Sequence, residues 1–283
     1  MIEIIKSGLY STIQDLGRFG YENYGVPISG SMDQLSSILS NKLLGNNDND
    51  AVMEITMTGP VLKFLEETKI CITGADISPS INDNSIDVNR VYQMNQGDVL
   101  KFGKLKYGLR SYIGVSGGFL SEKIMNSRSM HSNITKSNRI IRGESLKIKK
   151  SVKTKTKRTK INVNYLKHFK NNTIEVFKGP EFNKLTIKQK QVLLKKKFTI
   201  SNNNNRMAYQ LNESFDNQLD SIITSLVMQG TVQLTPSGKI IILMRDSQTC
   251  GGYPRILQLS KKSINKLSQK HMDNNIKFEL IDP

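Results

Sequence analysis

Most of the chain consists of short apolar or alternating runs that end at Gly, Pro, Asn or Asp, and this pattern predicts a mainly β fold. β-branched side chains suit a pleated strand, whereas the interrupting residues favour turns. Asn82-Asp83-Asn84 is expected to form a hairpin turn, and Pro236-Ser237-Gly238 is expected to join two apolar strands. The expected strands cover residues 2–6, 53–57, 69–73, 91–94, 99–102, 110–115, 173–178, 231–234, 239–245, 255–259 and 276–281.

One clear helix is predicted from residue 32 to residue 44. Ser31 is placed as its N-cap, with Gln34 three residues later as the second half of a capping box, and Gly45 supplies the C-terminal stop. The apolar stripe that is expected to face the core consists of Leu35, Ile38, Leu39 and Leu43.

A second helix is predicted over residues 187–196. Thr186 is placed as its N-cap because a hydroxyl oxygen can accept a hydrogen bond from a free backbone N–H in the first turn. Val192 and Leu193 are expected to face the core.

Positive charge is concentrated in one segment near the middle of the chain. The 41 Lys and Arg residues outnumber the 24 Asp and Glu residues, and the formal charge of +17 favours anionic partners. The segment contains Lys149, Lys150, Lys153, Lys155, Lys157, Arg158 and Lys160. It has no aromatic residue for base stacking, and no helix-turn-helix, RNA-recognition or zinc-finger pattern occurs. A solvated linker is therefore favoured over a nucleic-acid patch.

The basic segment also predicts the domain organisation. We expect an N-terminal β-rich domain at residues 1–150, a basic linker at 151–165 and a C-terminal β-rich domain at 166–283. Each half has the size of an ordinary domain.

The few cysteines and histidines argue against a disulfide framework or a metal site. Cys71 and Cys250 lie far apart, and the three histidines, His131, His168 and His271, show no metal-binding spacing. The chain begins MIEIIKSG, without the hydrophobic region of a signal peptide, and its longest apolar run, residues 240–244, is far shorter than the roughly 20 residues that span a bilayer. We expect a cytoplasmic protein without a membrane segment or a metal.

The first candidate functional segment runs from residue 8 to residue 33 and is rich in glycine. It carries Asp15, Arg18, Ser29 and Asp33, and the predicted helix start presents free backbone N–H groups that could bind an anion. The alternative is structural: Asp15 and Arg18 pair with each other, and Asp33 complements the helix dipole. The residues alone favour this structural interpretation.

The second candidate segment, residues 246–255, follows the apolar strand predicted at 239–245. Polar side chains at the end of a strand, on a loop held by a rigid sheet, are typical of functional sites. Asp246 could act as a general base or cap its own backbone, and Gln248 and Thr249 could bind amide or carboxylate groups. Cys250 has no evident histidine partner, which favours a packing role over that of a nucleophile.

These two segments resemble the hallmarks of the biotin-dependent carboxyltransferase family, also known as the allophanate hydrolase subunit 2 family. The first reads TIQDLGR, then GY, then GVPISGSMD, and the second reads DSQTCGGYPRI. The resemblance covers nearly the whole chain in the same order. The other matching stretches are EIT at 54–56, GP at 59–60, TGAD at 73–76, GDVL at 97–100, FG at 102–103, VSGG at 115–118, SRS at 127–129, GPE at 179–181, RMAY at 206–209 and GTVQ at 230–233.

Three stretches depart from the family pattern. A glycine-rich stretch before the domain junction is replaced by SNITKSNRIIR at residues 132–142, and Cys250 stands where threonine is common. The family's RMGYRLEG-like stretch is altered at Ala208, Gln210, Asn212 and Glu213. These departures leave the expected core in place and bear on activity or on a partner contact near the junction.

The resemblance implies β-rich domains with cyclophilin-like barrels and three alternative roles. The favoured role is the C-type subunit of an ATP-dependent 5-oxoprolinase complex that opens 5-oxo-L-proline to L-glutamate, together with a B-like subunit and an A-like subunit. The second is the carboxyltransferase subunit of a biotin-dependent carboxylase with a urea-type acceptor, and only this role calls for biotin. The third is a non-catalytic regulator that opposes a kinase-inhibiting partner.

The favoured chemistry suggests how the two hallmark segments would act. ATP can activate a lactam carbonyl by phosphorylating its oxygen, so the site needs donors for phosphoryl oxygens and a carboxylate to position water. We expect both segments to line one cleft, with Asp15, Arg18, Asp246 and Gln248 as catalytic residues. The expected substrate-binding residues are Ser29, Asp33, Thr249, Gly251, Gly252 and Tyr253. Because the chain has neither a P-loop nor a Rossmann glycine motif, ATP is expected to bind at another subunit or at an interface.

Overall fold

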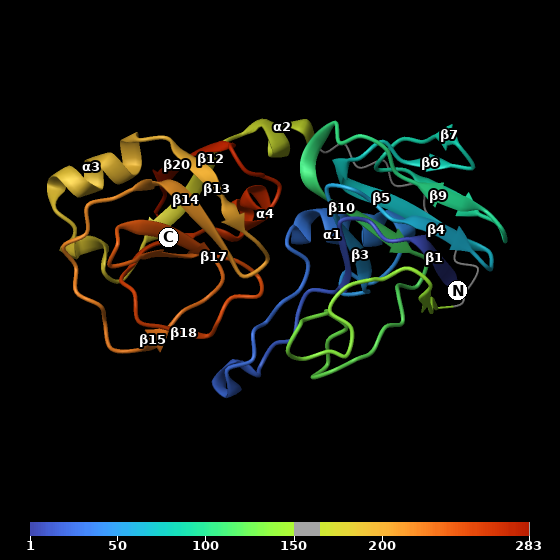
Figure 1. Ribbon diagram of the computed structural model, residues 1–283, viewed down its shortest axis with the longest axis horizontal. Helices are drawn as coiled ribbons and strands as arrows, with labels where there is room; N and C mark the ends of the chain where they lie inside the picture. Colours follow the sequence, from blue (N-terminus) through green and yellow to red (C-terminus); the bar gives the residue numbers. More distant parts are fainter. Residues whose placement is uncertain (150–164, 283) are drawn as a thin grey trace. The chain divides into compact units, whose positions relative to one another are not determined.

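The computed structural model describes residues 1–149 and 165–282 and is mainly β, as predicted (Figure 1). The described chain divides into two compact units. Unit 1 contains residues 1–18 and 29–149, and unit 2 contains residues 19–28 and 165–282. Except for Tyr165, the predicted linker at 151–165 lies outside the described residues.

Unit 1 is built from two sheets that share one hydrophobic core. The six-stranded sheet has the order β11-β1-β4-β9-β6-β7, and the five-stranded sheet has the order β2-β3-β10-β5-β8. Ile4 and Leu62 of the first sheet and Ile55 and Ile113 of the second are fully buried in this core, whose packing stabilises the unit. The strands are β1 (Ile2–Lys6), β2 (Tyr10–Gln14), β3 (Val52–Thr56), β4 (Val61–Phe64), β5 (Thr68–Asp76), β6 (Ser80–Ile81), β7 (Asn84–Ser85), β8 (Val91–Met94), β9 (Val99–Lys101), β10 (Tyr107–Val115) and β11 (Ser145–Leu146).

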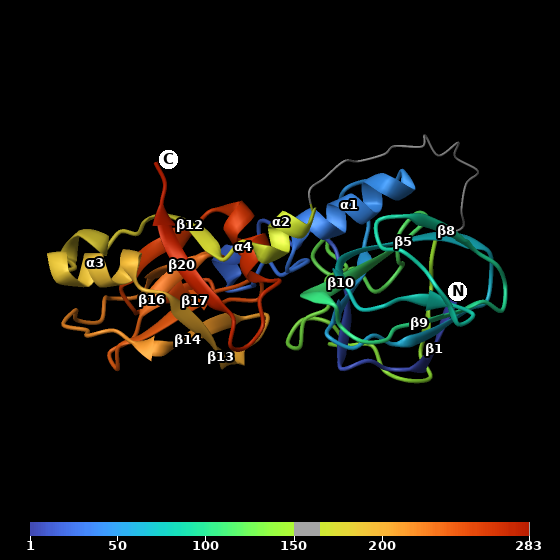
Figure 2. The same cartoon turned by 90° about the horizontal axis from the view of Figure 1, so that it is seen from above.

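Helix α1 (Gln34–Leu44) packs against β5 and β10 of the five-stranded sheet (Figure 2). Small residues allow a close approach, because the Ser40 side chain lies directly over Gly114. The Ser40 hydroxyl donates to the Cys71 carbonyl at 3.1 Å, and the Thr73 hydroxyl donates to the Ser36 carbonyl at 2.7 Å. The first turn of the helix, which follows the first hallmark segment, is therefore fixed to the sheet.

Unit 2 is a closed barrel of seven strands in the order β12-β19-β16-β17-β14-β13-β20 (Figure 1). Alternation places Val232, Leu234, Ile240 and Ile242 of β16 and β17 inside, where all four are fully buried. The barrel strands are β12 (Thr173–Lys178), β13 (Phe198–Asn204), β14 (Ala208–Ser214), β16 (Thr231–Leu234), β17 (Lys239–Leu243), β19 (Arg255–Leu259) and β20 (Asn275–Leu280). A separate pair of strands consists of β15 (Ser225–Leu226) and β18 (Cys250–Gly251).

The helices of unit 2 are short and cover the barrel. Helix α3 contacts β20, and helix α4 contacts β12 and β19. Thr186 caps α3 in a capping box with Gln189, as the N-cap prediction required. The elements are α2 (Tyr165–Lys170), α3 (Ile187–Lys195), α4 (Lys261–Leu267) and the 3-10 turns η1 (Glu22–Tyr24) and η2 (Phe182–Lys184).

Several local predictions need correction. The N-cap of α1 is Asp33 rather than Ser31, because the Asp33 carboxylate accepts from the Ser36 backbone N–H at 3.2 Å, while the Ser31 N–H bonds to the Asp15 carbonyl. The side chain of Val192 is 37% exposed, whereas Leu193 is fully buried as predicted. Of the predicted apolar stripe of α1, Leu39 is buried, Ile38 and Leu43 are partly buried, and Leu35 is exposed. The buried face of the helix comprises Ser36, Ser37, Leu39, Ser40, Asn41 and Leu44.

Several strands and helices of the structure were not predicted, whereas both predicted turns are present. Strands β2, β4, β13 and β14 and helices α2 and α4 were not predicted. Asn82 and Asp83 adopt positive φ values of 48° and 67° between β6 and β7, and Gly238, with φ 75°, turns the chain between β16 and β17. These values place all three residues in the left-handed region that tight hairpins require.

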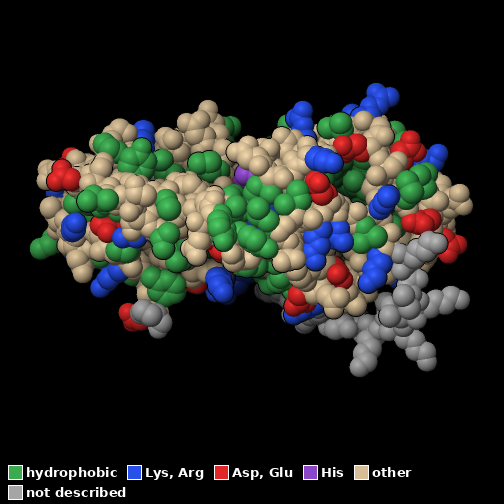
Figure 3. Space-filling model, turned by 90° about the horizontal axis from the view of Figure 1, so that it is seen from below, with side chains coloured by type: hydrophobic (Ala, Val, Ile, Leu, Met, Phe, Trp, Pro, Cys, Tyr) green, Lys and Arg blue, Asp and Glu red, His purple; other side chains and the backbone are tan. Residues whose placement is uncertain are grey.

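On the face drawn in Figure 3, Lys and Arg side chains are interspersed with acidic and hydrophobic ones and form no continuous basic surface. On this face, the positive charge of the described residues is thus distributed rather than gathered in a patch.

Candidate functional site

Asp15 anchors a second segment of unit 1, residues 127–129. Its carboxylate is buried and accepts four hydrogen bonds. Oδ1 accepts from the Gly17 N–H at 2.9 Å, the Ser127 hydroxyl at 2.7 Å and the Ser129 hydroxyl at 2.6 Å. Oδ2 accepts from the Arg128 N–H at 2.6 Å. Hydrogen bonds to a charged carboxylate are short and strong, so this residue fixes the backbone of 127–129.

Arg18 reaches the same segment from the other end of its loop. The guanidinium is fully buried, with Nη2 donating to the Ser129 carbonyl and Nη1 donating to the Ser29 hydroxyl at 3.0 Å. Ser29 has a positive φ of 59°, which bends the chain toward α1. Arg18 does not pair with Asp15, so the expected ion pair between them is wrong.

Asp33 takes part in a buried network at the start of α1. The Asp33 N–H donates to the Tyr112 hydroxyl at 2.8 Å, and that hydroxyl donates to Glu54 Oε2 at 2.9 Å. Arg110 Nε lies 3.9 Å from Glu54 Oε1. Burial, followed by the charges of Glu54 and Asp33, raises the pKa of Tyr112 well above its ordinary value, so the hydroxyl remains a donor. The Asp33 carboxylate caps the helix, a structural role at the position where its charge was expected to complement the helix dipole.

In unit 2, Asp246 forms a two-pronged ion pair with Arg206. Arg206 Nε donates to Oδ2 at 2.8 Å and Nη2 donates to Oδ1 at 3.1 Å. The Asp246 N–H also donates to the Arg206 carbonyl at 2.9 Å. Both side chains are largely buried, at 7% and 12% exposure. This pair joins the second hallmark segment to the turn before β14. The catalytic role expected for Asp246 stays a prediction.

The rest of the second segment forms a tight turn. The Ile222 N–H donates to the Gly252 carbonyl at 2.9 Å, and the Val227 N–H donates to the Thr249 carbonyl at 3.0 Å. A Cβ at Gly251 would lie 2.7 Å from Gln233 Nε2, so the end of the Gln233 side chain would have to move to admit a larger residue. Gln248 Oε1 is buried without a hydrogen-bond partner. Tyr253 is 40% exposed.

Arg255 ends the segment and is bound to Glu181. Arg255 Nε and Nη2 donate to the two carboxylate oxygens of Glu181, each at 3.1 Å, and the Arg255 N–H donates to Oε2 at 2.8 Å. Burial acts to raise the pKa of Glu181, but hydrogen bonds and charge from Arg255 outweigh it and hold the pKa below its ordinary value. Arg255 Nη1 donates to the Ser225 hydroxyl, which connects the ion pair to β15.

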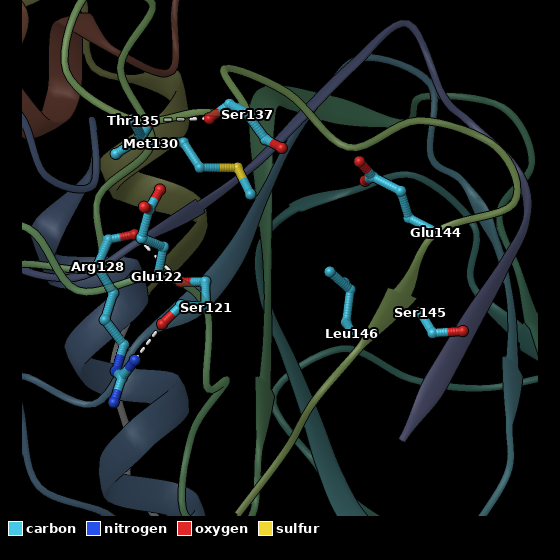
Figure 4. A pocket seen from close by; sticks show the side chains of 9 residues that line it. All are labelled: Ser121, Glu122, Arg128, Met130, Thr135, Ser137, Glu144, Ser145 and Leu146. Carbon is cyan, nitrogen blue, oxygen red and sulfur yellow. Dashed lines mark hydrogen bonds between the residues drawn. The ribbon is translucent and has the colours of Figure 1, made fainter.

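A cavity of about 250 Å³ borders residues 127–129 in unit 1 (Figure 4). Arg128 and Ser121 lie side by side along one side of it, and Glu144, Ser145 and Leu146 lie along the other. Its lining residues are Ser121, Glu122, Arg128, Met130, Thr135, Ser137, Glu144, Ser145 and Leu146. This region includes the stretch 132–142 that departs from the family pattern.

The structure brings together some of the predicted residues. Asp15 and Arg18 are connected through Ser129, Ser29 accepts from Arg18, and Asp33 takes part in the Glu54 network. All four belong to unit 1, and residues 246–253 belong to unit 2, so their common cleft stays a prediction.

The structure also identifies functional candidates that the sequence reasoning did not select. They are Ser127, Arg128, Ser129, Glu181 and Arg206. The sequence contained a signal for these five residues, because each of them lies in one of the short stretches that resemble the family: 127–129, 179–181 and 206–209.

The described residues contain no group of three or more His, Cys, Asp and Glu side chains arranged to hold a metal ion. None of the described helices combines the length and apolar character that a membrane crossing requires.

Comparisons with known proteins agree with the family resemblance. Residues 24–280 match the family model for the carboxyltransferase domain, subdomain A and B. The chain is similar to the C-type subunit of the 5-oxoprolinase of Haemophilus influenzae, with 30% identity over 99% of this chain and 91% of the relative. It is also similar to the C-type 5-oxoprolinase subunit of Escherichia coli, with 28% identity over 98% of this chain and 90% of the relative.

A solved structure with the same fold is the urea carboxylase of Kluyveromyces lactis. The TM-score is 0.89 at 25% identity, and the match covers 99% of this chain. This chain spans only 27% of that larger protein.

Proposed function

The chain belongs to the family of the carboxyltransferase domain, subdomain A and B, and we propose that it works as the C-type subunit of a 5-oxoprolinase. One observation carries the proposal: similarity to two such subunits extends over at least 98% of this chain and at least 90% of each relative. A match of this extent includes both hallmark segments and the whole of both units, rather than one shared domain.

The proposed reaction opens 5-oxo-L-proline to L-glutamate with hydrolysis of ATP, in a complex with a B-like and an A-like subunit. ATP would supply an activated carbonyl oxygen. The chain's own contribution would be to bind and orient the substrate, because its hallmark segments are held in place by buried hydrogen bonds and an ion pair. Its sequence has no P-loop or Rossmann glycine motif, which favours an ATP site on another subunit or at an interface.

The roles of the individual residues divide into positioning and contact. Asp15, Arg18 and Asp246 have their charged groups engaged by other parts of the chain, so we assign them to positioning the loops. Gln248, with a buried acceptor atom that has no partner, and Tyr253, which is 40% exposed, are the better candidates for substrate contact in the second segment.

Reconstitution tests the proposal directly. The chain is mixed with its B-like and A-like partner subunits, 5-oxo-L-proline and ATP, and release of L-glutamate is measured. We expect turnover that requires all three subunits and ATP. Omitting each subunit in turn is the control, and full turnover without this chain would rule out the proposed role.

A second candidate is supported by the solved structure of a urea carboxylase, to which the chain is similar over 99% of its length. In this role the chain would transfer a carboxyl group from biotin to a urea-type acceptor and would need a separate biotin-bearing partner. The same preparation is assayed with urea, ATP, bicarbonate and a biotinylated carrier. Carboxylation of urea without glutamate release from 5-oxo-L-proline would favour this candidate.

A further inference from the structure

The first hallmark segment holds one arginine in a fixed place. The Arg128 N–H donates to Asp15 Oδ2 at 2.6 Å, and its carbonyl accepts from the Ser121 hydroxyl at 3.3 Å. The hydroxyls of Ser127 and Ser129, on either side, both donate to Asp15 Oδ1. The side chain of Arg128 therefore begins from a backbone that is fixed on both sides, which is a requirement for a precise binding group.

The guanidinium of Arg128 is not neutralised by a carboxylate. The side chain is partly buried, and its Nη1 donates to the Ser121 carbonyl. Among the residues that the structure describes, no acidic group lies within ion-pair distance of it. Arg206 and Arg255, by contrast, each bind both oxygens of a carboxylate. The Nε and Nη2 groups of Arg128 are thus available to an oxyanion, whose geometry a guanidinium matches.

The surrounding segment is strongly basic. Residues 119–149 contain seven Lys and Arg residues against Glu122 and Glu144. Each of these two carboxylates accepts a backbone N–H of the same segment, Glu122 from Lys136 and Glu144 from Ile141. The balance of charge favours a negatively charged ligand.

The cavity beside Arg128 sets the size of such a ligand. Its volume of about 250 Å³ lies below the range that is usual for drug-sized ligands, so a small molecule is the better fit. Hydroxyl groups of Ser121, Ser137 and Ser145 provide further hydrogen-bonding partners, and Met130 and Leu146 provide apolar surface (Figure 4).

We propose that Arg128 and this cavity bind the oxyanion, a carboxylate or a phosphoryl group, of a small ligand. The inference rests on the proposed function only in the choice of 5-oxo-L-proline, a small carboxylate, as the first probe. Asp15 and Arg18 are the positioning residues of this site, and Arg128 contacts the ligand.

The test compares Arg128→Gln with Arg139→Gln, which removes the same charge from an exposed position of the same segment. Binding is measured by titration calorimetry with the full chain, alone and together with its partner subunits. The three probes are 5-oxo-L-proline, inorganic phosphate and 2-pyrrolidinone, which has the same lactam ring without the carboxylate. Circular dichroism confirms that both variants are folded.

We expect Arg128→Gln to weaken binding of an oxyanion probe by about tenfold or more, as loss of a charge-assisted hydrogen bond implies, and Arg139→Gln to change it by less than about twofold. The effect on 5-oxo-L-proline identifies a carboxylate site, and the effect on phosphate identifies a phosphoryl site. Binding of 2-pyrrolidinone should be the same in all variants. Equal binding of both oxyanion probes by the wild type and Arg128→Gln, or no binding of either probe in any preparation, would overturn the proposal.

The outcome is separable from that of the proposed function. If glutamate forms but neither oxyanion probe depends on Arg128 for binding, the site is wrong and the function stands. If oxyanion binding depends on Arg128 but no glutamate forms, the site stands and the function is wrong.

Discussion

At the scale of single residues, Asp15 and Asp246 show two ways of holding a carboxylate away from solvent. Asp15 accepts hydrogen bonds from backbone N–H groups and hydroxyls, whereas Asp246 faces the guanidinium of Arg206. An uncharged replacement therefore has different consequences at the two positions. Only the replacement of Asp246 removes a negative charge that faces a buried positive charge, that of Arg206.

Asp15→Asn should destabilise unit 1 and loosen residues 127–129. The new amide group would direct an N–H toward donors, so we expect a loss of about 2–4 kcal/mol in the free energy of unfolding. Hydrogen–deuterium exchange should become faster at 127–129. Asp87→Asn is the control, since Asp87 belongs to an exposed ion pair with Arg90, and it should change stability by less than about 0.5 kcal/mol. Unchanged exchange at 127–129 would contradict this prediction.

Asp246→Asn should cost about 3 kcal/mol, because it removes the carboxylate that faces the buried Arg206 cation. Adding Arg206→Gln should recover part of the loss, so that the double variant is more stable than the sum of the two single variants predicts. Chemical denaturation of all four proteins gives the coupling energy. Additive effects would show that the ion pair contributes nothing of its own.

At the scale of elements, α1 depends on small residues rather than on an apolar stripe. Ser36, Ser37 and Ser40 are buried against the sheet, and the hydroxyls of Ser37 and Ser40 bond to carbonyls of the helix and of the sheet. A helical pattern of leucines indicates the core-facing surface only where the space between the helix and the sheet is wide enough for large side chains. Here Gly114 of β10 brings the helix closer to the sheet than leucines would allow.

Gly114→Ala should push α1 away from β10. The added Cβ would collide with Ser40 Oγ and would lie 2.9 Å from Leu44 Cδ1, so a loss of about 2 kcal/mol is expected from overpacking. Ser40→Ala removes the first of these obstacles and should make Gly114→Ala less costly than it is in the wild type. Thermal denaturation of the four proteins measures this, and an equal cost in both backgrounds would contradict the proposed clash.

Two buried lysines of unit 2 connect its last helix to the barrel. The Lys266 ammonium donates to the Thr173 carbonyl at the start of β12. Lys270, just after α4, donates to the Phe169 carbonyl and to Asn172 Oδ1, each at 2.6 Å. Burial, with a further contribution from the charge of Lys266, lowers the pKa of Lys270 to about 8.

The lowered pKa of Lys270 predicts a gain in stability at alkaline pH. Below about pH 8 both the folded and the unfolded chain hold this proton, and folding bears the cost of burying the ammonium. Between about pH 8 and the ordinary lysine pKa of about 10.4, the unfolded state binds more protons, so the free energy of unfolding rises by on the order of 1–3 kcal/mol. Urea denaturation at about pH 7.5 and about pH 10 measures the rise. Lys270→Met should lack this contribution, and equal slopes in the two proteins would contradict the assignment.

At the scale of the whole molecule, the net charge of +17 is the property most relevant to assembly. A surface with excess positive charge accelerates encounters with an acidic partner, and salt screens this attraction. We expect the association rate of this chain with the proposed B-like and A-like subunits to fall at least about tenfold between roughly 50 mM and 500 mM salt. Stopped-flow mixing measures the rate. A rate that does not depend on salt would show that the charge does not guide assembly.

The family and the mainly β class could be predicted from the sequence because both depend on local information. Turn residues at 82–84 and 236–238 act within a few residues of themselves, and the hallmark segments are recognisable as strings. The predicted strands at 91–94, 173–178, 231–234 and 255–259 correspond residue by residue to β8, β12, β16 and β19. Strand β2 was missed because its sequence lies within a glycine-rich segment that favoured a loop.

The partners of the charged residues were decided only by the tertiary structure. Asp15 lies three residues from Arg18 in the sequence, yet it binds residues 127–129, and Asp246 binds an arginine 40 positions earlier. A buried charge is stabilised by whichever opposite charge or dipole the folded chain brings within hydrogen-bonding distance, and sequence separation does not determine that distance. For this reason the sequence identified which segments matter, whereas the fold determined that Asp15 and Arg18 hold residues 127–129 in place.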